Sequence, residues 1–380
     1  VSSDEITTLS LTVFDGGEEI ICKDISLDED VEIPSFKLWS PEEPNLYYFT
    51  LEIKKDGKIL DSVKSYFGMR KYSFGTDKFG ILRLFLNNEP YFQRGLLDQG
   101  YWPDGGLTPP CDEAMIFDIK EMKRLGFNML RKHIKIEPMR WYYHCDRLGM
   151  IVWQDMMSGG AYIGDLYAGV LPNLGIKVKD DNYKIFNREE KKARDDFKRE
   201  LGEMIEQLYN VVSIYCWVPF NEGWGQFDAL KICNYVKSLD STRLVDHASG
   251  WYDQGGGDIY SLHNYFYPLR VRPQTRTVAL SEYGGIAWPM PGHEAPGRTY
   301  GYGTAKSRAD LTARCKKLQL GTVLPQLKKG LSALVYTQLT DVEDEVNGLF
   351  TYDRAEIKPD ANAVRSVNAA LAAEFAKVTQ

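Results

Sequence analysis

Residues 1 to about 75 alternate apolar and polar positions in short runs that are rich in β-branched and aromatic residues. Runs such as Ile6–Phe14, Leu46–Lys54 and Ser62–Phe67 are typical of β-strands, and the Asp-Gly steps between such runs are typical of hairpin turns. About six strands fit here, which is few for a complete β-sandwich. The pattern therefore predicts a small all-β sandwich that is truncated at its N-terminal side.

From about residue 80 the pattern changes to strand, loop and helix. Met115, Ile119 and Met122 share one helical face, and residues 197–208 carry a longer apolar stripe. Apolar strand candidates begin at Tyr91, Asn128, Ile151, Val212, Arg243, Asp258, Thr277 and Leu331. Eight β-α units over roughly 300 residues predict an α/β fold, a (β/α)8 TIM barrel over residues 76–380 that follows the all-β module at 1–75. A doubly wound sheet is the alternative, but no GxGxxG follows any strand.

Charge and cysteine usage narrow the partners and the compartment. The formal net charge is −7 and no long Lys/Arg run occurs, so neither nucleic acid nor a membrane surface is an expected partner. No apolar run is long enough to cross a bilayer. The six scattered cysteines form no CxxC pair and favour free thiols in a reducing, cytoplasmic compartment. Because the chain begins with Val1 rather than Met, we expect the natural N-terminus to be missing, and export stays open.

Two strand ends combine a carboxylate with small neighbours. Asn221-Glu222-Gly223 follows the fourth predicted barrel strand, and Ser281-Glu282-Tyr283-Gly284 closes the seventh. Reactive groups of such barrels lie at this C-terminal face. A carboxylate that ends an apolar strand is costly to bury unless it is paired or used. Two of them suit glycosidic cleavage, in which one protonates the leaving oxygen while the other attacks or stabilises the anomeric carbon.

With these two motifs the chain resembles glycoside hydrolase family 2, whose members include β-galactosidases, β-glucuronidases and β-mannosidases. The resemblance covers nearly the whole chain. It implies that residues 1–75 are the family's immunoglobulin-like module and that the remainder is its catalytic barrel. The jelly-roll sugar-binding domain that normally precedes these two is not in this sequence.

The resemblance also implies roles for individual residues. Glu222 would be the general acid/base and Glu282 the nucleophile of a retaining mechanism, with the two carboxyl groups only about 5–5.5 Å apart. Asn221 would bind the sugar 2-hydroxyl, and Tyr265 would hold the nucleophile through its hydroxyl. Arg131, at the end of the second strand, would keep Glu282 ionised through its fixed positive charge.

Other polar and aromatic residues at strand ends and in loops are further candidates for sugar binding. Each has a plain structural alternative, as a satisfied loop residue or a packing ring. These candidates are Asp155, His133, His263, Trp224, Trp251, Trp288 and, as an aromatic platform at the eighth strand, Tyr336. Two long loops, about 158–193 and 286–310, exceed ordinary connections and are expected to shape the pocket or cover it.

The sequence departs from the family at two places. Many relatives carry a His three residues after the Arg of the second strand, whereas here Arg131-Lys132-His133 places it one step earlier, so the role is not transferred to His133. The Asn-x-Lys with which β-glucuronidases recognise a sugar carboxylate falls on Glu345-Val346-Asn347. An acid in place of the Lys would repel a uronate, which favours a neutral sugar, with galactose first by family frequency.

Metal and cofactor motifs are absent from the sequence. None of the five histidines forms a His-x-His or HExxH pattern, and the acidic run at 341–345 lacks the oxygen spacing and the Gly of a calcium loop. We therefore expect no cofactor and no metal, and interpret the acidic run as a solvated or hydroxyl-binding loop.

Together these features predict an exo-acting, retaining β-glycosidase for a terminal β-linked neutral sugar, similar to a β-galactosidase. Within the family, β-mannosidase, β-glucuronidase and arabinosidase activities are alternatives. A catalytically inactive, carbohydrate-binding barrel is the alternative of another class. The expected partner is an oligosaccharide, a polysaccharide or a small glycoside, and homo-oligomerisation is left open.

Overall fold

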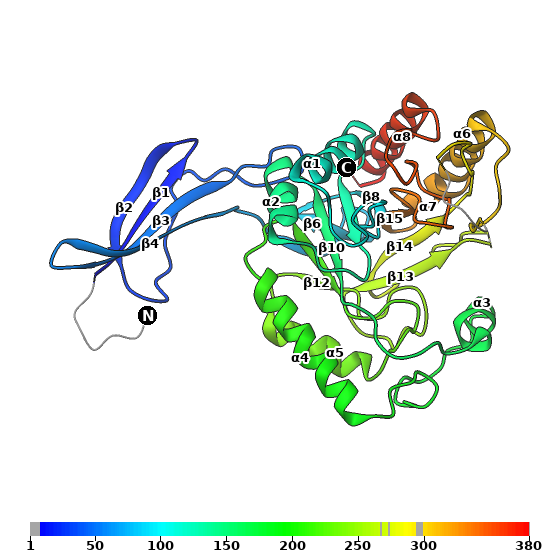
Figure 1. Ribbon diagram of the computed structural model, residues 1–380, viewed down its shortest axis with the longest axis horizontal. Helices are drawn as coiled ribbons and strands as arrows, with labels where there is room; N and C mark the ends of the chain where they lie inside the picture. The colour runs from blue at the N-terminus through cyan, green and yellow to red at the C-terminus, as the bar shows by residue number, and fades with distance from the viewer. Residues whose placement is uncertain (1–7, 267, 273, 294–298, 380) are drawn as a thin grey trace.

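The computed structural model describes residues 8–266, 268–272, 274–293 and 299–379. Figure 1 shows a β-sheet that projects to one side of a larger α/β body. The projecting sheet is antiparallel, with the strand order β2-β1-β3-β4. Its strands are β1 (Thr8–Asp15), β2 (Glu18–Ile25), β3 (Tyr47–Lys55) and β4 (Lys58–Phe67).

Both expected hairpins are present in this sheet. Gly16 and Gly17 join β1 to β2, and Asp56 and Gly57 join β3 to β4. Asp56 and Gly57 both have positive φ, 50° and 74°, as a two-residue turn that matches the strand twist requires. Among the described residues, the N-terminal part therefore forms one sheet of four strands rather than about six strands. Its core consists of Leu11, Val13, Ile33 and Tyr47.

The larger body is built on eight parallel strands in the order β12-β11-β10-β9-β8-β15-β14-β13. These are β8 (Gln93–Asp98), β9 (Met129–Lys132), β10 (Ile151–Asp155), β11 (Ile214–Val218), β12 (Leu244–Val245), β13 (Ile259–Asn264), β14 (Thr277–Gly284) and β15 (Leu331–Thr337). Each begins within two residues of its predicted start. The strands follow chain order around a nearly closed ring, so the TIM barrel is confirmed. At the seam between β12 and β13, the Asp258 backbone N–H donates to Val245 O at 2.9 Å.

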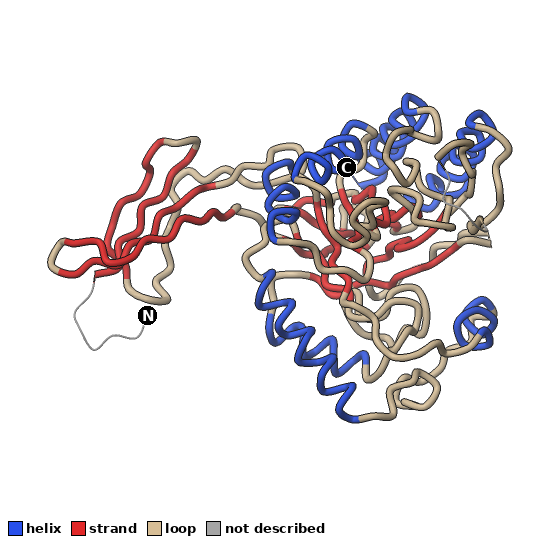
Figure 2. Tube along the Cα trace, in the orientation of Figure 1, coloured by secondary structure: helices blue, strands red, loops and turns tan. Residues whose placement is uncertain are grey.

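Helices surround the strands on the outside of the body (Figure 2). They are α1 (Asp112–Arg124), α2 (Met139–Leu148), α3 (Leu171–Asn173), α4 (Lys191–Leu208), α5 (Ala229–Leu239), α6 (Arg308–Lys316), α7 (Leu324–Leu327) and α8 (Ala361–Thr379), with π-helical turns η1 (Leu166–Val170) and η2 (Lys317–Val323). The described residues that follow β12 and β13 form no helix before the next strand. Gly149 ends α2 in the left-handed conformation at φ 73°, as its position predicts.

Two apolar cores hold the body together. One lies between strands and helices and contains the predicted stripe of α4, from Phe197 to Leu208. The other fills the barrel interior, where Trp153 is fully buried and its ring N–H donates to Gln93 Oε1 at 2.7 Å. A small sheet of β5 (Tyr72–Thr76), β6 (Leu82–Leu86) and β7 (Glu89–Pro90) packs Leu84 and Leu86 into this second core. Residue 75, near which we expected the two parts to divide, lies in β5.

The projecting sheet is attached to the barrel through Asp146 of α2. The Asp146 carboxylate accepts the Tyr66 hydroxyl of β4 at 2.9 Å and the backbone N–H groups of Val212 and Ser213 at 3.1 and 2.7 Å. The backbone carbonyl of the same residue accepts the indole N–H of Trp39, which is fully buried, at 2.7 Å. One buried residue thus connects β4, the segment between β2 and β3, and the residues that directly precede β11.

We predict that Tyr66→Phe lowers the free energy of unfolding by about 1–3 kcal/mol, because it removes one donor from a fully buried carboxylate. The midpoint of urea unfolding measures the change. Tyr48→Phe is the matched control, since the Tyr48 hydroxyl pairs with the Tyr143 hydroxyl of α2, at 3.2 Å, in an exposed contact of the same sheet. Equal midpoints for the two variants would contradict the proposed attachment.

Candidate active site

Glu222 and Glu282 meet at the C-terminal ends of the barrel strands, although β12 and β13 lie between their strands around the ring. Glu222 follows β11 at φ 50°, and its backbone N–H donates to Ser249 O at 3.0 Å. Non-glycine residues rarely take this conformation, and strained backbone of this kind is concentrated at functional sites. The loop after β11 is therefore fixed to the loop after β12, and this contact sets the position of Glu222.

Glu282 reaches the barrel interior because β14 contains one extra residue relative to its neighbours. Leu262 pairs with Leu280 and His263 with Glu282, so the register shifts by one residue at Ser281. Simple alternation would place Glu282 on the same outward face as Leu280, toward the helices. The bulge returns Glu282 to the inside, while Tyr283 packs outward in the core that contains Leu280.

Arg131 of β9 is fully buried at the centre of the site. Its Nε and Nη2 donate to the two oxygens of Asp155, at 2.9 and 3.0 Å. Its Nη1 donates to Glu282 Oε1 at 3.2 Å and to Ser281 O at 3.1 Å, and its Nη2 also donates to Asn221 Oδ1 at 2.9 Å. Burial alone would lower the pKa of Arg131, but the carboxylates of Asp155 and Glu282 outweigh it and raise the pKa above its usual value.

Glu282 is held from its other side by Tyr265. The Tyr265 hydroxyl donates to Glu282 Oε2 at 2.7 Å and lies 3.0 Å from Thr337 Oγ1, at the end of β15. Each oxygen of Glu282 therefore has its own donor, a guanidinium for one and a phenol for the other.

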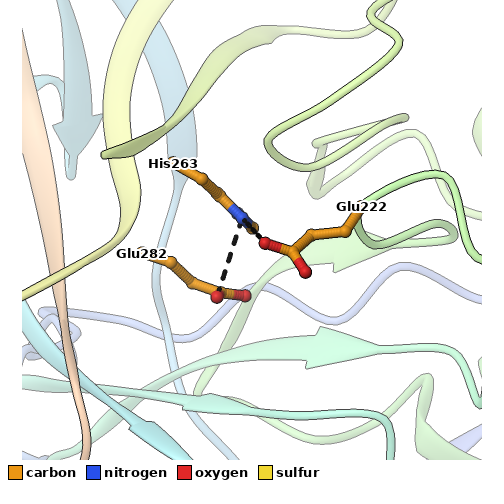
Figure 3. Close-up of side chains that lie close together, drawn as sticks. All are labelled: Glu222, His263 and Glu282. Carbon is orange, nitrogen blue, oxygen red and sulfur yellow. Dashed lines mark hydrogen bonds and ion pairs between the residues drawn. The ribbon is translucent and has the colours of Figure 1, made fainter. Parts of the chain in front are cut away.

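His263 lies between the two glutamates (Figure 3). Its Nδ1 is 2.8 Å from Glu222 Oε1 and 3.6 Å from Glu282 Oε2. Its Nε2 faces Arg131 Nη1 at 3.5 Å and Ser249 Oγ at 3.2 Å. Because a guanidinium can only donate, Nε2 is the acceptor and Nδ1 carries the proton that is donated to Glu222. Burial lowers the pKa of His263 to about 4, so the ring is neutral near pH 7.

The two glutamates differ in their surroundings. Burial raises the pKa of Glu222 to about 7, and the Glu345 carboxylate adds to this, while His133 and Arg131 oppose it. Arg131 donates to Glu282 but not to Glu222. The site thus combines one carboxyl group that keeps its proton near neutral pH with a second one that is held by a buried cation.

The structure brings most of the predicted site residues into one hydrogen-bonded network: Arg131, Asn221, Glu222, His263, Tyr265 and Glu282. Asp155 belongs to this network, but not as a direct sugar ligand. It is only 1% exposed, and Arg131 and His133, the latter at 2.9 Å from Oδ2, occupy its oxygens. His133 therefore contacts Asp155 rather than facing away from the site.

Tyr336 does not join the network, and its predicted role as a platform is wrong. Side chains alternate along β15, so Ala333 and Val335 point into the barrel while Leu334 and Tyr336 point toward the helices. The Tyr336 ring packs at 5.5 Å against Tyr283, and its hydroxyl is 3.3 Å from Cys315 Sγ.

The three tryptophans of the loops lie outside this network. Trp251 is half-buried two residues after Ser249, to which its backbone N–H donates at 3.1 Å. Trp224 packs its ring on Tyr162 at 5.4 Å, and the Trp288 backbone N–H donates to Val346 O at 2.9 Å.

Polar residues that the sequence interpretation missed join Glu345 beside the glutamates. Gln99 Nε2 donates to Glu345 Oε2 at 2.8 Å and to Gln338 Oε1 at 2.9 Å. Asn347 Nδ2 donates to Glu345 Oε1 at 3.0 Å and accepts from Gln338 through its oxygen at 2.8 Å. Gln99 and Gln338 each directly follow a barrel strand, a position that could have identified them. The acidic run is anchored at its start, where Asp341 forms a 2.7 Å ion pair with buried Lys358.

One group of metal-ligand type lies at the site. Among the described residues, Glu222, His263 and Glu282 each offer one ligand atom, and these atoms lie within 4.8 Å of one another. They are the same side chains that the hydrogen-bonded network uses. A cation bound there would take the space between the two carboxylates.

Comparisons with known proteins match both parts of the chain. The model of glycosyl hydrolases family 2 matches residues 3–70, and the model of the family's TIM barrel domain matches residues 102–282. A β-galactosidase of Oenococcus oeni is 38% identical over 264 residues, which cover 68% of this chain and 23% of the relative. A β-glucuronidase of Bacteroides fragilis is 26% identical, covering 75% of this chain and 42% of the relative.

Solved structures agree on the fold. A β-D-glucuronidase of Dictyoglomus thermophilum superimposes with a TM-score of 0.74 at 14% identity, over 96% of this chain and 64% of that one. The chain spans less than half the length of the curated relatives it matches. No helix in the described part of the chain is both long and apolar enough to cross a membrane. The two family models together match about two thirds of the chain, and the match to the barrel model includes both Glu222 and Glu282. The chain therefore belongs to glycosyl hydrolases family 2.

Proposed function

We propose that this chain hydrolyses terminal β-linked glycosides of a neutral sugar with retention of the anomeric configuration. The observation that carries the proposal is the pairing of Glu222 and Glu282, whose carboxylate oxygens approach within 4.8 Å. Retaining glycosidases hold their two carboxyl groups about 5–5.5 Å apart, whereas inverting enzymes leave about 6.5–9.5 Å for a water molecule. The short separation favours direct attack by one carboxylate on the sugar.

In the first step Glu282 attacks the anomeric carbon and Glu222 protonates the leaving oxygen. Arg131 and Tyr265 fix the two oxygens of Glu282, so the nucleophile is oriented before the substrate arrives. The raised pKa of Glu222, about 7, leaves a proton available for the leaving group.

In the second step Glu222 takes a proton from water, and this water releases the sugar from Glu282. His263 is a positioning residue in both steps, because its Nδ1–H binds Glu222 Oε1 at 2.8 Å. This bond occupies one oxygen of the acid, so the transferred proton resides on Oε2. The side-chain oxygen of Asn221 accepts a hydrogen bond from Arg131, so the amide N–H groups of Asn221 are left to donate to a sugar hydroxyl.

The sugar specificity is proposed from Glu345. Its carboxylate is close enough to Glu222 to raise the pKa of that residue. Gln99 and Asn347 hold it in place. A carboxylate there accepts hydrogen bonds from hydroxyls and repels the carboxylate of a uronate. Relatives are named both β-galactosidase and β-glucuronidase, and Glu345 favours the neutral sugar.

We predict that Glu282→Gln lowers kcat/KM on a p-nitrophenyl β-glycoside by about 10⁴-fold or more and that Glu222→Gln lowers it by about 10²–10⁴-fold. The reason is that the first variant removes the nucleophile and the second the proton donor. Azide should rescue Glu222→Ala with a β-glycosyl azide product and Glu282→Ala with an α-glycosyl azide, which NMR distinguishes.

The matched control is Glu203→Gln, a glutamate exposed on α4. Equal activity of all the variants would overturn the assignment. Binding of sugars without turnover by the unaltered chain would instead favour an inactive, carbohydrate-binding barrel.

A second prediction concerns pH. Glu222 must be protonated to act as acid, so kcat/KM should fall as the pH rises through about 7, the pKa of that residue. Glu345→Gln removes the neighbouring negative charge, which lowers the pKa of Glu222. The basic limb of the pH profile should therefore move to lower pH. Glu343→Gln changes an exposed acid of the same loop and should leave the limb unmoved. A basic limb at the same pH in all three proteins would exclude this electrostatic coupling.

A third prediction concerns the substrate. We expect kcat/KM for p-nitrophenyl β-D-galactoside to exceed that for the β-D-glucuronide by about tenfold or more. Repulsion of about 1–2 kcal/mol between Glu345 and the carboxylate of the uronate would produce this difference. A panel of β-glycosides that also includes mannoside and arabinoside measures it. Preference for the glucuronide would refute the neutral-sugar proposal while leaving the mechanism intact.

A further inference from the structure

We propose that Tyr302, Tyr300 and Phe266 form a binding surface for the leaving group of the glycoside, one that takes a flat apolar face such as an aryl ring or the C–H face of a second pyranose. This inference rests on the proposed hydrolysis of glycosides by Glu222 and Glu282.

Tyr302 lies one ring away from the nucleophile. Its ring stacks on that of Tyr265 with centroids 3.6 Å apart and an interplanar angle of 10°. The Tyr265 hydroxyl binds Glu282 at 2.7 Å. The pKa of Tyr302 is raised, first by burial and a hydrogen bond with Tyr300 and then by the Glu222 carboxylate, whose effect exceeds that of Glu282. Tyr302 therefore lies close to both glutamates, separated from Glu282 by the ring of Tyr265.

The segment that carries Tyr302 is fixed to the catalytic strand. The Tyr302 backbone N–H donates to Gly285 O at 2.8 Å, directly after β14. Gly285 has φ 61°, and a Cβ at this position would lie 2.4 Å from Cδ2 of the Tyr302 ring. On the other side, the Tyr300 N–H donates to Asp344 O at 2.6 Å, and Val346 N–H donates to Tyr300 O at 3.1 Å. The rings are thus anchored between Glu282 and the loop of Glu345.

The other two rings face solvent. Phe266 is 67% exposed and Tyr300 is 51% exposed. Both meet Tyr302 edge to face, at 5.4 Å and 67° for Phe266 and at 5.6 Å and 71° for Tyr300. Large exposed apolar rings that gather at one place typically mark a binding site. Glu282 is buried whereas Phe266 and Tyr300 face solvent, so a substrate whose terminal sugar is held at Glu282 would reach these rings with its leaving group.

The experiment compares glycosides that share one sugar and differ only in the leaving group: fluoride, methanol, p-nitrophenol and a second pyranose. Phe266→Ala and Tyr300→Ala should lower kcat/KM about tenfold for the aryl or pyranose leaving groups, the size expected for loss of one ring contact. The fluoride and methyl glycosides should be cleaved as by the unaltered protein. Tyr300→Phe, which keeps the ring, should retain the activity of the unaltered protein on all four.

Phe79→Ala is the matched control, because Phe79 is 60% exposed between β5 and β6 and far from the site in sequence. A loss confined to aryl or to pyranose glycosides supports the surface and names its occupant. An equal change for all four substrates, or no change, overturns it. Failure of the unaltered protein to cleave any β-glycoside would instead refute the proposed function, so the two failures are distinguishable.

Discussion

The site depends on one buried positive charge, the guanidinium of Arg131. Burying a guanidinium away from water costs free energy unless each N–H donor has an acceptor. Here the acceptors come from β10, from β14 and from the loop that follows β11. Asp155 binds it through two parallel hydrogen bonds, a geometry that Arg forms and Lys cannot. Because Asn221 and Glu282 take the remaining donors, the same contact that neutralises the charge also fixes the spacing of the groups that would act on the sugar. Stability and geometry are therefore not separable at this residue.

The barrel strands and the pair of glutamates were predictable from the sequence because both follow from simple periodic rules. Continuous apolar runs of strand length located all eight strands, and a carboxylate at a strand end is rare enough to stand out. The same rules fail where a strand departs from period two. Alternation correctly places Tyr336 outside the barrel, and only the expectation of a platform at that position led to the wrong role. Alternation would equally have placed Glu282 outside, and the bulge at Ser281, which no residue pattern announces, reverses it.

Loops and connections were the least predictable part. The described residues after β12 and β13 form no helix, although eight β-α units were expected. These connections instead carry Ser249 and Tyr265, which support Glu222 and Glu282. Glu345 is a departure from the family pattern that the sequence shows, but its partner Gln99 comes from the other end of the barrel sequence and meets Glu345 only in space. Pairings of this kind depend on loop conformation, which local propensity does not determine.

The two glutamates illustrate how neighbouring carboxyl groups can be given different surroundings. Both carboxyl groups lie at the same end of the same barrel, and their oxygens lie within 4.8 Å of each other, so position along the barrel does not separate them. Their donors do. Glu282 receives a cation and a phenol, while Glu222 receives the N–H of a neutral imidazole and faces a second acid. Since His263 presents its acceptor nitrogen to Arg131 and its donor nitrogen to Glu222, the charge that holds one carboxylate also sets the tautomer that orients the other. The asymmetry between the two carboxyl groups thus originates in Arg131 and reaches Glu222 through the ring of His263.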